Sequence, residues 1–111
     1  MASKTNKVRG FVPVKMDKER TFRYNYDAFE LIEETLGTPF ASLKVEQLRL
    51  KELKVIIWAG LVHEDPELKL EDVGPLIDEA ESIQYVAEKM NEAVTLSMQG
   101  KSQPEKKAKT K

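Results

Sequence analysis

The residues best suited to chemistry stand together at His63, Glu64 and Asp65, directly after the most apolar stretch of the chain. An imidazole beside two carboxylates is a combination used in metal sites and in general acid–base catalysis. A zinc site needs three or four ligands, however, and the sequence has one histidine, no cysteine and no HExxH motif. Solvated side chains at the end of a helix explain these three residues, so we assign them no catalytic or metal-binding role.

Nucleophilic catalysis and phosphate binding are not indicated either, because the sequence has no Gly-x-Ser-x-Gly elbow and no glycine-rich loop after a strand. Adjacent carboxylates do recur along the chain, at Glu33–Glu34, Glu64–Asp65, Glu71–Asp72 and Glu79 with Glu81. With 19 acidic residues among 111, such pairs arise by chance, and we interpret them as solvated helix faces. The sequence therefore predicts a protein that is not an enzyme and uses no cofactor.

Composition predicts one small domain between two polar ends. Residues 1–7 are polar and basic, and residues 99–111 contain five lysines and only small or polar side chains. Neither end can bury enough apolar surface to offset the entropy lost on ordering, so we expect a flexible N-terminus, a single domain over residues 8–98 and a disordered lysine-rich tail. The chain has no apolar run of the ~18 residues that span a membrane and no signal peptide, which predicts a cytoplasmic protein without membrane contacts.

The apolar stretch predicts a central helix over residues 50–64. One side of this helix repeats apolar residues at helical spacing, and a second side adds more: Leu50, Leu53, Ile57 and Leu61, then Val55, Trp58 and Val62. Gly60 inside the helix costs about 1 kcal/mol relative to alanine, which indicates that a neighbouring element approaches closely there. We expect the helix to end before Asp65–Pro66, where a new N-cap can form.

The remaining elements follow from alternation, capping residues and helical periodicity. Residues 8–14 and 20–24 alternate as two strands of a β-hairpin, with Phe22 and Tyr24 on one face. A first helix over 26–36 is capped by Asn25 or Asp27 and ends at Gly37. Short turns are expected at 39–43, 45–48, 67–69 and 70–73.

Two further helices complete the map. Pro75 cannot sit inside a helix, so a third helix is predicted over residues 75–81. Ser82 caps the last helix, whose buried stripe is Ile83, Val86, Ala87, Met90, Ala93 and Val94. The predicted fold is mainly α: an N-terminal β-hairpin followed by about four helices packed around the central apolar helix.

The central helix carries more apolar side chains than one buried stripe requires. A domain of this size has difficulty covering every side of one helix, so a partner-binding surface is predicted at Val55, Trp58, Leu61 and Val62. Tryptophan is also strongly enriched among the residues that anchor protein interfaces. The other interpretation is that Trp58 is the largest filler of the core, packed under the hairpin, and the sequence leaves both open.

The central stretch resembles the tail assembly chaperones of long-tailed bacteriophages and gene transfer agents. The resemblance is carried by Ile57-Trp58-Ala59-Gly60-Leu61-Val62-His63-Glu64-Asp65-Pro66, followed by Leu68, Val73–Gly74 and Leu76-Ile77-Asp78. The group reads Trp-Ala-Gly-Leu, a His-Glu-Asp-Pro-like turn and a Val-Gly-x-Leu-Ile-Asp segment. The upstream hairpin and first helix agree, so the resemblance covers residues 20–94.

This resemblance implies a small helical factor that binds the tape measure protein and keeps it soluble while the tail tube polymerises around it. Such factors work in the host bacterial cytoplasm and are absent from the mature virion. The implied partners are the tape measure protein, the tail tube protein, a second copy of the chain and a longer frameshift product, for which the codons of Lys106–Lys107 would supply the slippery run. An alternative hypothesis from another class is a small DNA- or RNA-associated regulatory protein that uses the lysine-rich tail.

Overall fold

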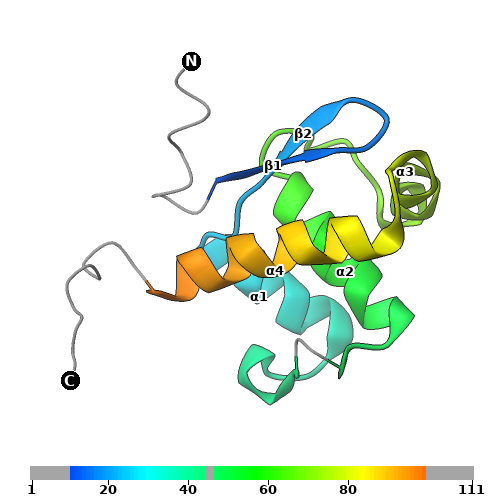
Figure 1. Cartoon of the computed structure of the whole chain (residues 1–111). Coiled ribbons are helices and arrows are strands. Elements are labelled where there is room, and N and C mark those ends of the chain that lie inside the picture. The colour runs from blue at the N-terminus through cyan, green and yellow to red at the C-terminus, as the bar shows by residue number, and fades with distance from the viewer. Residues whose placement is uncertain (1–10, 45–46, 100–111) are drawn as a thin grey trace.

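The computed structural model describes residues 11–44 and 47–99, which form a mainly helical fold with one β-hairpin (Figure 1). In chain order the elements are β1 (Val12–Lys15), β2 (Glu19–Phe22), α1 (Tyr26–Leu36), α2 (Leu50–Leu61), α3 (Val73–Glu79) and α4 (Ile83–Gln99). Two single 3-10 turns, η2 (Phe40–Ser42) and η4 (Leu70–Asp72), lie in the connections. The predicted fold class is confirmed at this level. The flexible N-terminus, the disordered tail and part of the turn predicted at 45–48 lie outside the described residues.

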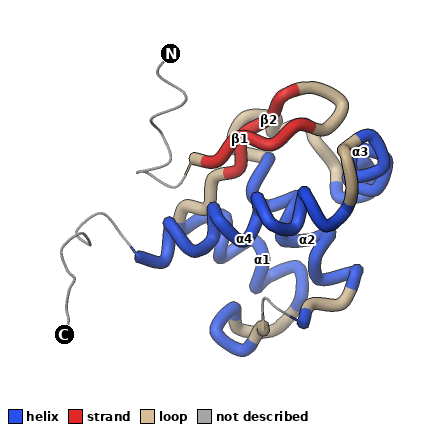
Figure 2. Tube along the Cα trace, viewed as in Figure 1, coloured by secondary structure: helices blue, strands red, loops and turns tan. Residues whose placement is uncertain are grey.

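The hairpin packs on the helices through both of its strands, β1 against α4 and β2 against α2 (Figure 2). Antiparallel pairing sets Val12 opposite Phe22 and Pro13 opposite Thr21. Phe22 and Tyr24 are both buried, and their stacked rings lie 6.0 Å apart between centroids, as the alternation predicted. A two-stranded hairpin is marginal alone, so this apolar face depends on the helices for its stability.

Helix α1 has the predicted boundaries and both predicted caps. The side chain of Asn25 accepts a hydrogen bond from the Ala28 amide at 2.8 Å, which settles the choice between Asn25 and Asp27. At the other end, Gly37 takes the left-handed conformation with φ of 71°, and its amide bonds to the Glu33 carbonyl. Ala28 and Ile32 form the fully buried part of the helix.

Helix α2 is the central element, in contact with α1, β2, α3 and α4. Six consecutive or near-consecutive residues of this helix are buried: Val55, Ile56, Ile57, Ala59, Gly60 and Leu61. The close approach predicted at Gly60 is confirmed, since a Cβ there would lie 2.5 Å from the Tyr24 hydroxyl and 2.9 Å from Phe22 Cδ1. The same Tyr24 hydroxyl donates a 2.6 Å hydrogen bond to the Ile56 carbonyl. Glycine is therefore the residue that lets the hairpin aromatics lie on the helix.

The predicted end of the central helix at Glu64 is wrong by one turn, because α2 ends at Leu61. The residue that follows β2, Arg23, bonds to the Gly60 carbonyl, which would otherwise accept the next hydrogen bond of the helix. In an α-helix the Glu64 amide would bond to the Gly60 carbonyl, but Arg23 donates its own amide there at 3.0 Å. The amides of Glu64 and Asp65 instead share the Leu61 carbonyl, both at 3.2 Å. Residues 66–69 form no helix, and a single turn is closed by the Leu68 amide on the Asp65 carbonyl at 3.0 Å, slightly before the turn predicted at 67–69.

The predicted third helix is also corrected, because α3 begins at Val73 and ends at Glu79. Pro75 lies in the first turn of α3, where backbone amides have no intrahelical partner, so its missing N–H costs nothing. In α4 the Ser82 hydroxyl accepts from the Tyr85 amide at 3.0 Å, which confirms the predicted cap. Val86, Met90, Ala93 and Val94 are buried as predicted, whereas Ile83 at the helix start is 44% exposed. Within the described ranges, no helix is both long and apolar enough to cross a membrane.

Candidate binding groove

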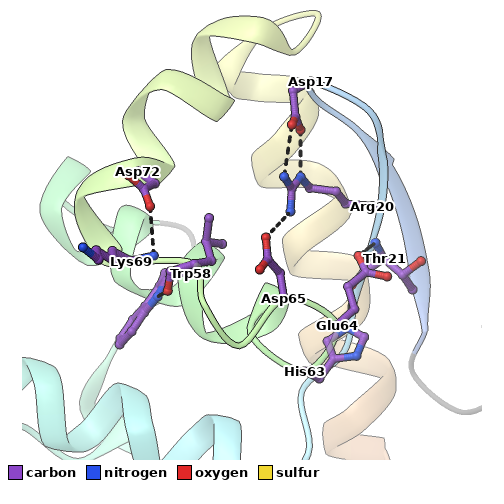
Figure 3. Close-up of polar contacts among 10 residues, drawn as sticks. Asp17, Arg20, Thr21, Trp58, His63, Glu64, Asp65, Lys69 and Asp72 are labelled. Atoms are coloured by element: carbon purple, nitrogen blue, oxygen red, sulfur yellow. Dashed lines mark hydrogen bonds and ion pairs between the residues drawn. The ribbon is translucent and has the colours of Figure 1, made fainter.

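The four residues predicted to bind a partner divide into two pairs. Val55 and Leu61 are fully buried in the core and cannot reach a partner in this conformation. Trp58 and Val62 are half-buried and present part of their surface to solvent. The indole N–H of Trp58 donates to the Leu68 carbonyl at 2.9 Å, and Figure 3 shows the ring directed away from Arg20 and His63. Trp58 therefore packs against the chain that follows α2 and against the edge of the core, so part of its ring is core and part is open to solvent.

The His63-Glu64 pair binds the outer edge of β2. His63 Nε2 donates to the Thr21 carbonyl at 2.7 Å, and Glu64 Oε1 accepts from the Thr21 amide at 2.8 Å (Figure 3). Both backbone groups of Thr21 point away from Pro13, so the missing N–H of the proline does not weaken the ladder. An open strand edge invites pairing with other chains, and these two side chains occupy it.

Asp65 continues this set of contacts through the buried side chain of Arg20. Arg20 donates two hydrogen bonds to the carboxylate of Asp17, at 2.7 and 3.0 Å, and one to Asp65 at 3.5 Å. The Arg20 guanidinium beside it holds the pKa of Asp17 below its usual range. The same pairing raises the pKa of Arg20, first through the Asp17 hydrogen bond, so the buried guanidinium stays charged.

Four of the acidic residues interpreted as solvated also make specific contacts, although Glu33, Glu64 and Asp72 are exposed as predicted. Besides Glu64 and Asp65, the Glu33 side chain accepts from the Phe40 amide at 2.7 Å, and Asp72 accepts from the Lys69 amide at 3.1 Å. Hydrophobic periodicity describes one helix or strand at a time, so it does not predict contacts between elements. In the part of the chain that the structure describes, no cluster of three or more His, Cys, Asp or Glu side chains could hold a metal ion.

A surface groove of about 490 Å³ lies between α1 and the C-terminal end of α2. Its lining residues come from both helices and the turns beside them: Asn25, Asp27, Ala28, Glu30, Leu31, Glu34, Ala59, Val62 and His63. Ala28 and Ala59 are buried and form a floor of small side chains, while Leu31 and Val62 are half-buried on opposite walls. The groove follows α1 from residue 27 to residue 34, which at 1.5 Å per residue is about 10 Å, or two helical turns.

The α1 side of the groove has an acidic rim formed by Asp27, Glu30 and Glu34. These residues are exposed, and their spacing of three and four places them on one side of the helix, next to Leu31. Among the described residues, none of the three carboxylates has a hydrogen bond or an ion pair through its side chain. The opposite side carries Val62 and His63, whose ring is held by Thr21 and stacks on Phe11 at 6.1 Å between centroids. The groove thus has an apolar centre and negative charge along one edge only.

The prediction of a binding surface named Val62 but missed the α1 half of the groove. The sequence does contain a signal for the α1 side, because helical spacing places three carboxylates beside Leu31, at Asp27, Glu30 and Glu34. What the pattern does not reveal is that α1 lies against the end of α2, which creates the hollow between them.

Comparison with known proteins adds no relative: no family model, no curated protein and no solved structure matches this chain.

Proposed function

We propose that this protein is a non-enzymatic tail assembly chaperone that binds a helical segment of the tape measure protein and keeps that protein soluble during tail tube assembly. The sequence resemblance of residues 57–66 supplies the class, and the groove between α1 and α2 is the observation that carries the binding role. The tail tube protein, a second copy of the chain and a longer frameshift product remain proposed partners. The host bacterial cytoplasm remains the proposed location, and absence from the finished virion is part of the same proposal.

The dimensions and lining of the groove support a helix as the bound element. An amphipathic helix binds by laying anchors at positions i, i+3 or i+4, and i+7 into a hydrophobic groove. The groove beside α1 is two turns long, which accommodates such a set of anchors. Ala28 and Ala59 are too small to fill the groove, so a partner side chain can enter between Leu31 and Val62.

Two half-buried side chains give this surface its affinity for apolar anchors. Leu31 and Val62 each expose part of an apolar side chain across the hollow, and Trp58 lies one helical turn before Val62 on α2. Covering exposed apolar surface releases about 25 cal/mol per Å², so a partner helix that buries both walls gains affinity without any change in the core. A holdase also needs a soluble surface, which the 33% of charged residues provides.

The edge of β2 supports the same choice of binding mode. Peptides can also bind by adding a strand to an exposed sheet edge. Here the backbone groups of Thr21 are already occupied by His63 and Glu64, and the Lys15 amide of the other strand donates to the Tyr85 hydroxyl at 3.0 Å. The hairpin edges are therefore poor sites for strand addition, and the groove is the better site.

Co-expression with the tape measure protein tests the proposal. The variant Leu31→Gln makes one groove wall polar, and Leu50→Gln is the matched control, because Leu50 is 73% exposed and lies outside the groove. We expect the wild-type chain and Leu50→Gln to keep the tape measure protein in the soluble fraction, and Leu31→Gln to lose this effect while retaining its circular dichroism spectrum. If the wild-type chain leaves the tape measure protein insoluble and does not bind it, the proposed function is wrong.

The alternative proposal, a DNA- or RNA-associated regulator, depends on residues 100–111, which lie outside the described part of the chain. Removing these residues separates the two proposals. Loss of nucleic-acid binding together with unchanged binding to the tape measure protein would leave the chaperone proposal intact and give the tail a separate role. Nucleic-acid binding without any binding to the tape measure protein would favour the alternative.

A further inference from the structure

We propose that the helix received by the groove between α1 and α2 is basic along one edge, with lysine or arginine beside an apolar stripe of two turns. This inference rests on the proposed function and specifies the chemistry of the partner segment. The partner helix must then carry positive charge as well as apolar anchors, and it belongs to another protein.

The charge requirement follows from the rim of the groove. Asp27, Glu30 and Glu34 lie along the α1 side, and the described lining contains no lysine or arginine. Their carboxylates have no ion pair or hydrogen bond through the side chain among the described residues, so they are available to a partner. A helix lying parallel to α1 in the groove would bring one row of its side chains beside all three carboxylates.

The asymmetry of the groove predicts on which edge the partner is basic. The α2 wall ends in Val62 and His63, and the imidazole is already bonded to the Thr21 carbonyl. Negative charge is therefore concentrated on the α1 side, and only the partner edge that faces α1 gains from carrying lysine or arginine. Complementary charge of this kind contributes to specificity and to the rate of association more than to affinity.

Two other occupants fit the rim less well. A symmetric dimer that paired this groove with itself would bring six carboxylates together, since an isologous interface uses the same patch on both copies. A nucleic acid would set its phosphates against the same carboxylates, whereas nucleic-acid binding depends on neutralising phosphates with cationic side chains. A basic helix of a different protein meets neither repulsion.

Three fluorescently labelled peptides of about 18 residues test the inference, measured by anisotropy against the full chain. They share a helical sequence with leucine at positions i, i+4, i+7 and i+11, and they differ only in carrying lysine, glutamine or glutamate along one edge of that stripe. We expect the lysine peptide to bind about eightfold more tightly than the glutamine peptide, because each of three exposed ion pairs contributes a factor of roughly two. The glutamate peptide should bind more weakly still, because its like charges are repelled by the rim. The difference should shrink at high salt.

Charge reversal in the protein locates the effect. The double variant Glu30→Lys, Glu34→Lys should reverse the preference and bind the glutamate peptide more tightly than the lysine peptide. The control Glu67→Lys, Glu71→Lys changes net charge equally at two exposed positions outside the groove and should keep the wild-type preference. Equal loss of lysine-peptide binding in both double variants would show nonspecific attraction and overturn the inference.

The remaining outcomes separate this inference from the proposed function. If all three peptides bind alike and Leu31→Gln weakens them all, the groove receives apolar helices without a charge requirement, and only the inference is overturned. Failure of every peptide to bind also overturns it, while the tape measure co-expression result still decides the proposed function. Self-association of the chain that is abolished by Leu31→Gln would identify a second copy as the occupant and would likewise overturn the inference.

Discussion

Replacing Gly60 with alanine is expected to destabilise the fold, although the same change inside an ordinary helix stabilises it. The added Cβ would lie 2.5 Å from the Tyr24 hydroxyl and 2.9 Å from Phe22 Cδ1, with the ring carbon Cζ of Tyr24 also in contact. These distances are too short for real Cβ contacts, so the rings of the hairpin have to move. Tyr24 is also fixed by its 2.6 Å hydrogen bond to the Ile56 carbonyl, which limits how far it can move.

The magnitude follows from three contributions. Overpacking a core site costs about 1–3 kcal/mol. Breaking the buried hydrogen bond between Tyr24 and Ile56 costs about 1–3 kcal/mol more, and the better helix propensity of alanine returns about 1 kcal/mol. The net loss is about 3 kcal/mol of the free energy of unfolding, which is a large part of the 5–15 kcal/mol typical of small domains. For a slope of about 1.5 kcal/mol per molar urea, the unfolding midpoint falls by about 2 M.

Urea unfolding followed by circular dichroism measures this loss, and Thr95→Ala provides the control. Thr95 is exposed in α4, so alanine there improves helix propensity without crowding a neighbour and should raise stability by about 0.5 kcal/mol. Opposite signs at the two positions are the expected result. If Gly60→Ala is as stable as the wild type, the close approach of the hairpin to α2 is wrong.

Three further predictions concern the contacts between the hairpin and the turn after α2. Arg20 lowers the pKa of Asp17 in the folded state, so the stabilising contribution of Asp17 is present above its usual pKa of 3.8 and is lost as pH falls through the folded pKa. Asp17→Asn should therefore flatten the decline of stability that urea unfolding measures below about pH 4. An unchanged decline would refute the pairing of Asp17 with Arg20. Glu64→Ala should accelerate hydrogen exchange of the Thr21 amide, whereas Glu64→Gln, which keeps an acceptor oxygen, should do so much less; equal rates in both variants would contradict the contact. Trp58→Phe should cost about 1 kcal/mol through loss of the hydrogen bond to the Leu68 carbonyl, measured by thermal unfolding, and a neutral result would show that this bond contributes nothing.

The parts of the fold that were predictable are those encoded locally. Helix α1 has its expected bounds because Asn25 and Gly37 mark both ends through their own side-chain and backbone chemistry. The close approach at Gly60 was also predictable, because glycine in an apolar helix costs stability that packing must recover. Its contact partners, Tyr24 and Phe22, were not identified in advance.

The sequence-based predictions were wrong or incomplete where the structure of one element depends on contacts with another. The α2 helix stops at Leu61 because the Arg23 amide takes the Gly60 carbonyl, and no local pattern at residues 62–64 reports that contact. His63 and Glu64 bind Thr21, more than 40 residues earlier in the chain, so their role depends on tertiary structure. The groove has the same origin, since its two walls belong to α1 and α2 and only their packing brings Leu31 opposite Val62.

Site-specific photo-cross-linking tests the central claim most directly. A photoreactive amino acid placed at Glu34, on the rim of the groove, is compared with one at Glu67, which is exposed and does not line the groove. Both positions are at the surface, so neither replacement disturbs the core. With the tape measure protein co-expressed, we predict a cross-link to that protein from position 34 and none from position 67. A cross-link from position 67 alone, or none from either position in a complex that forms, would contradict binding in the groove between α1 and α2.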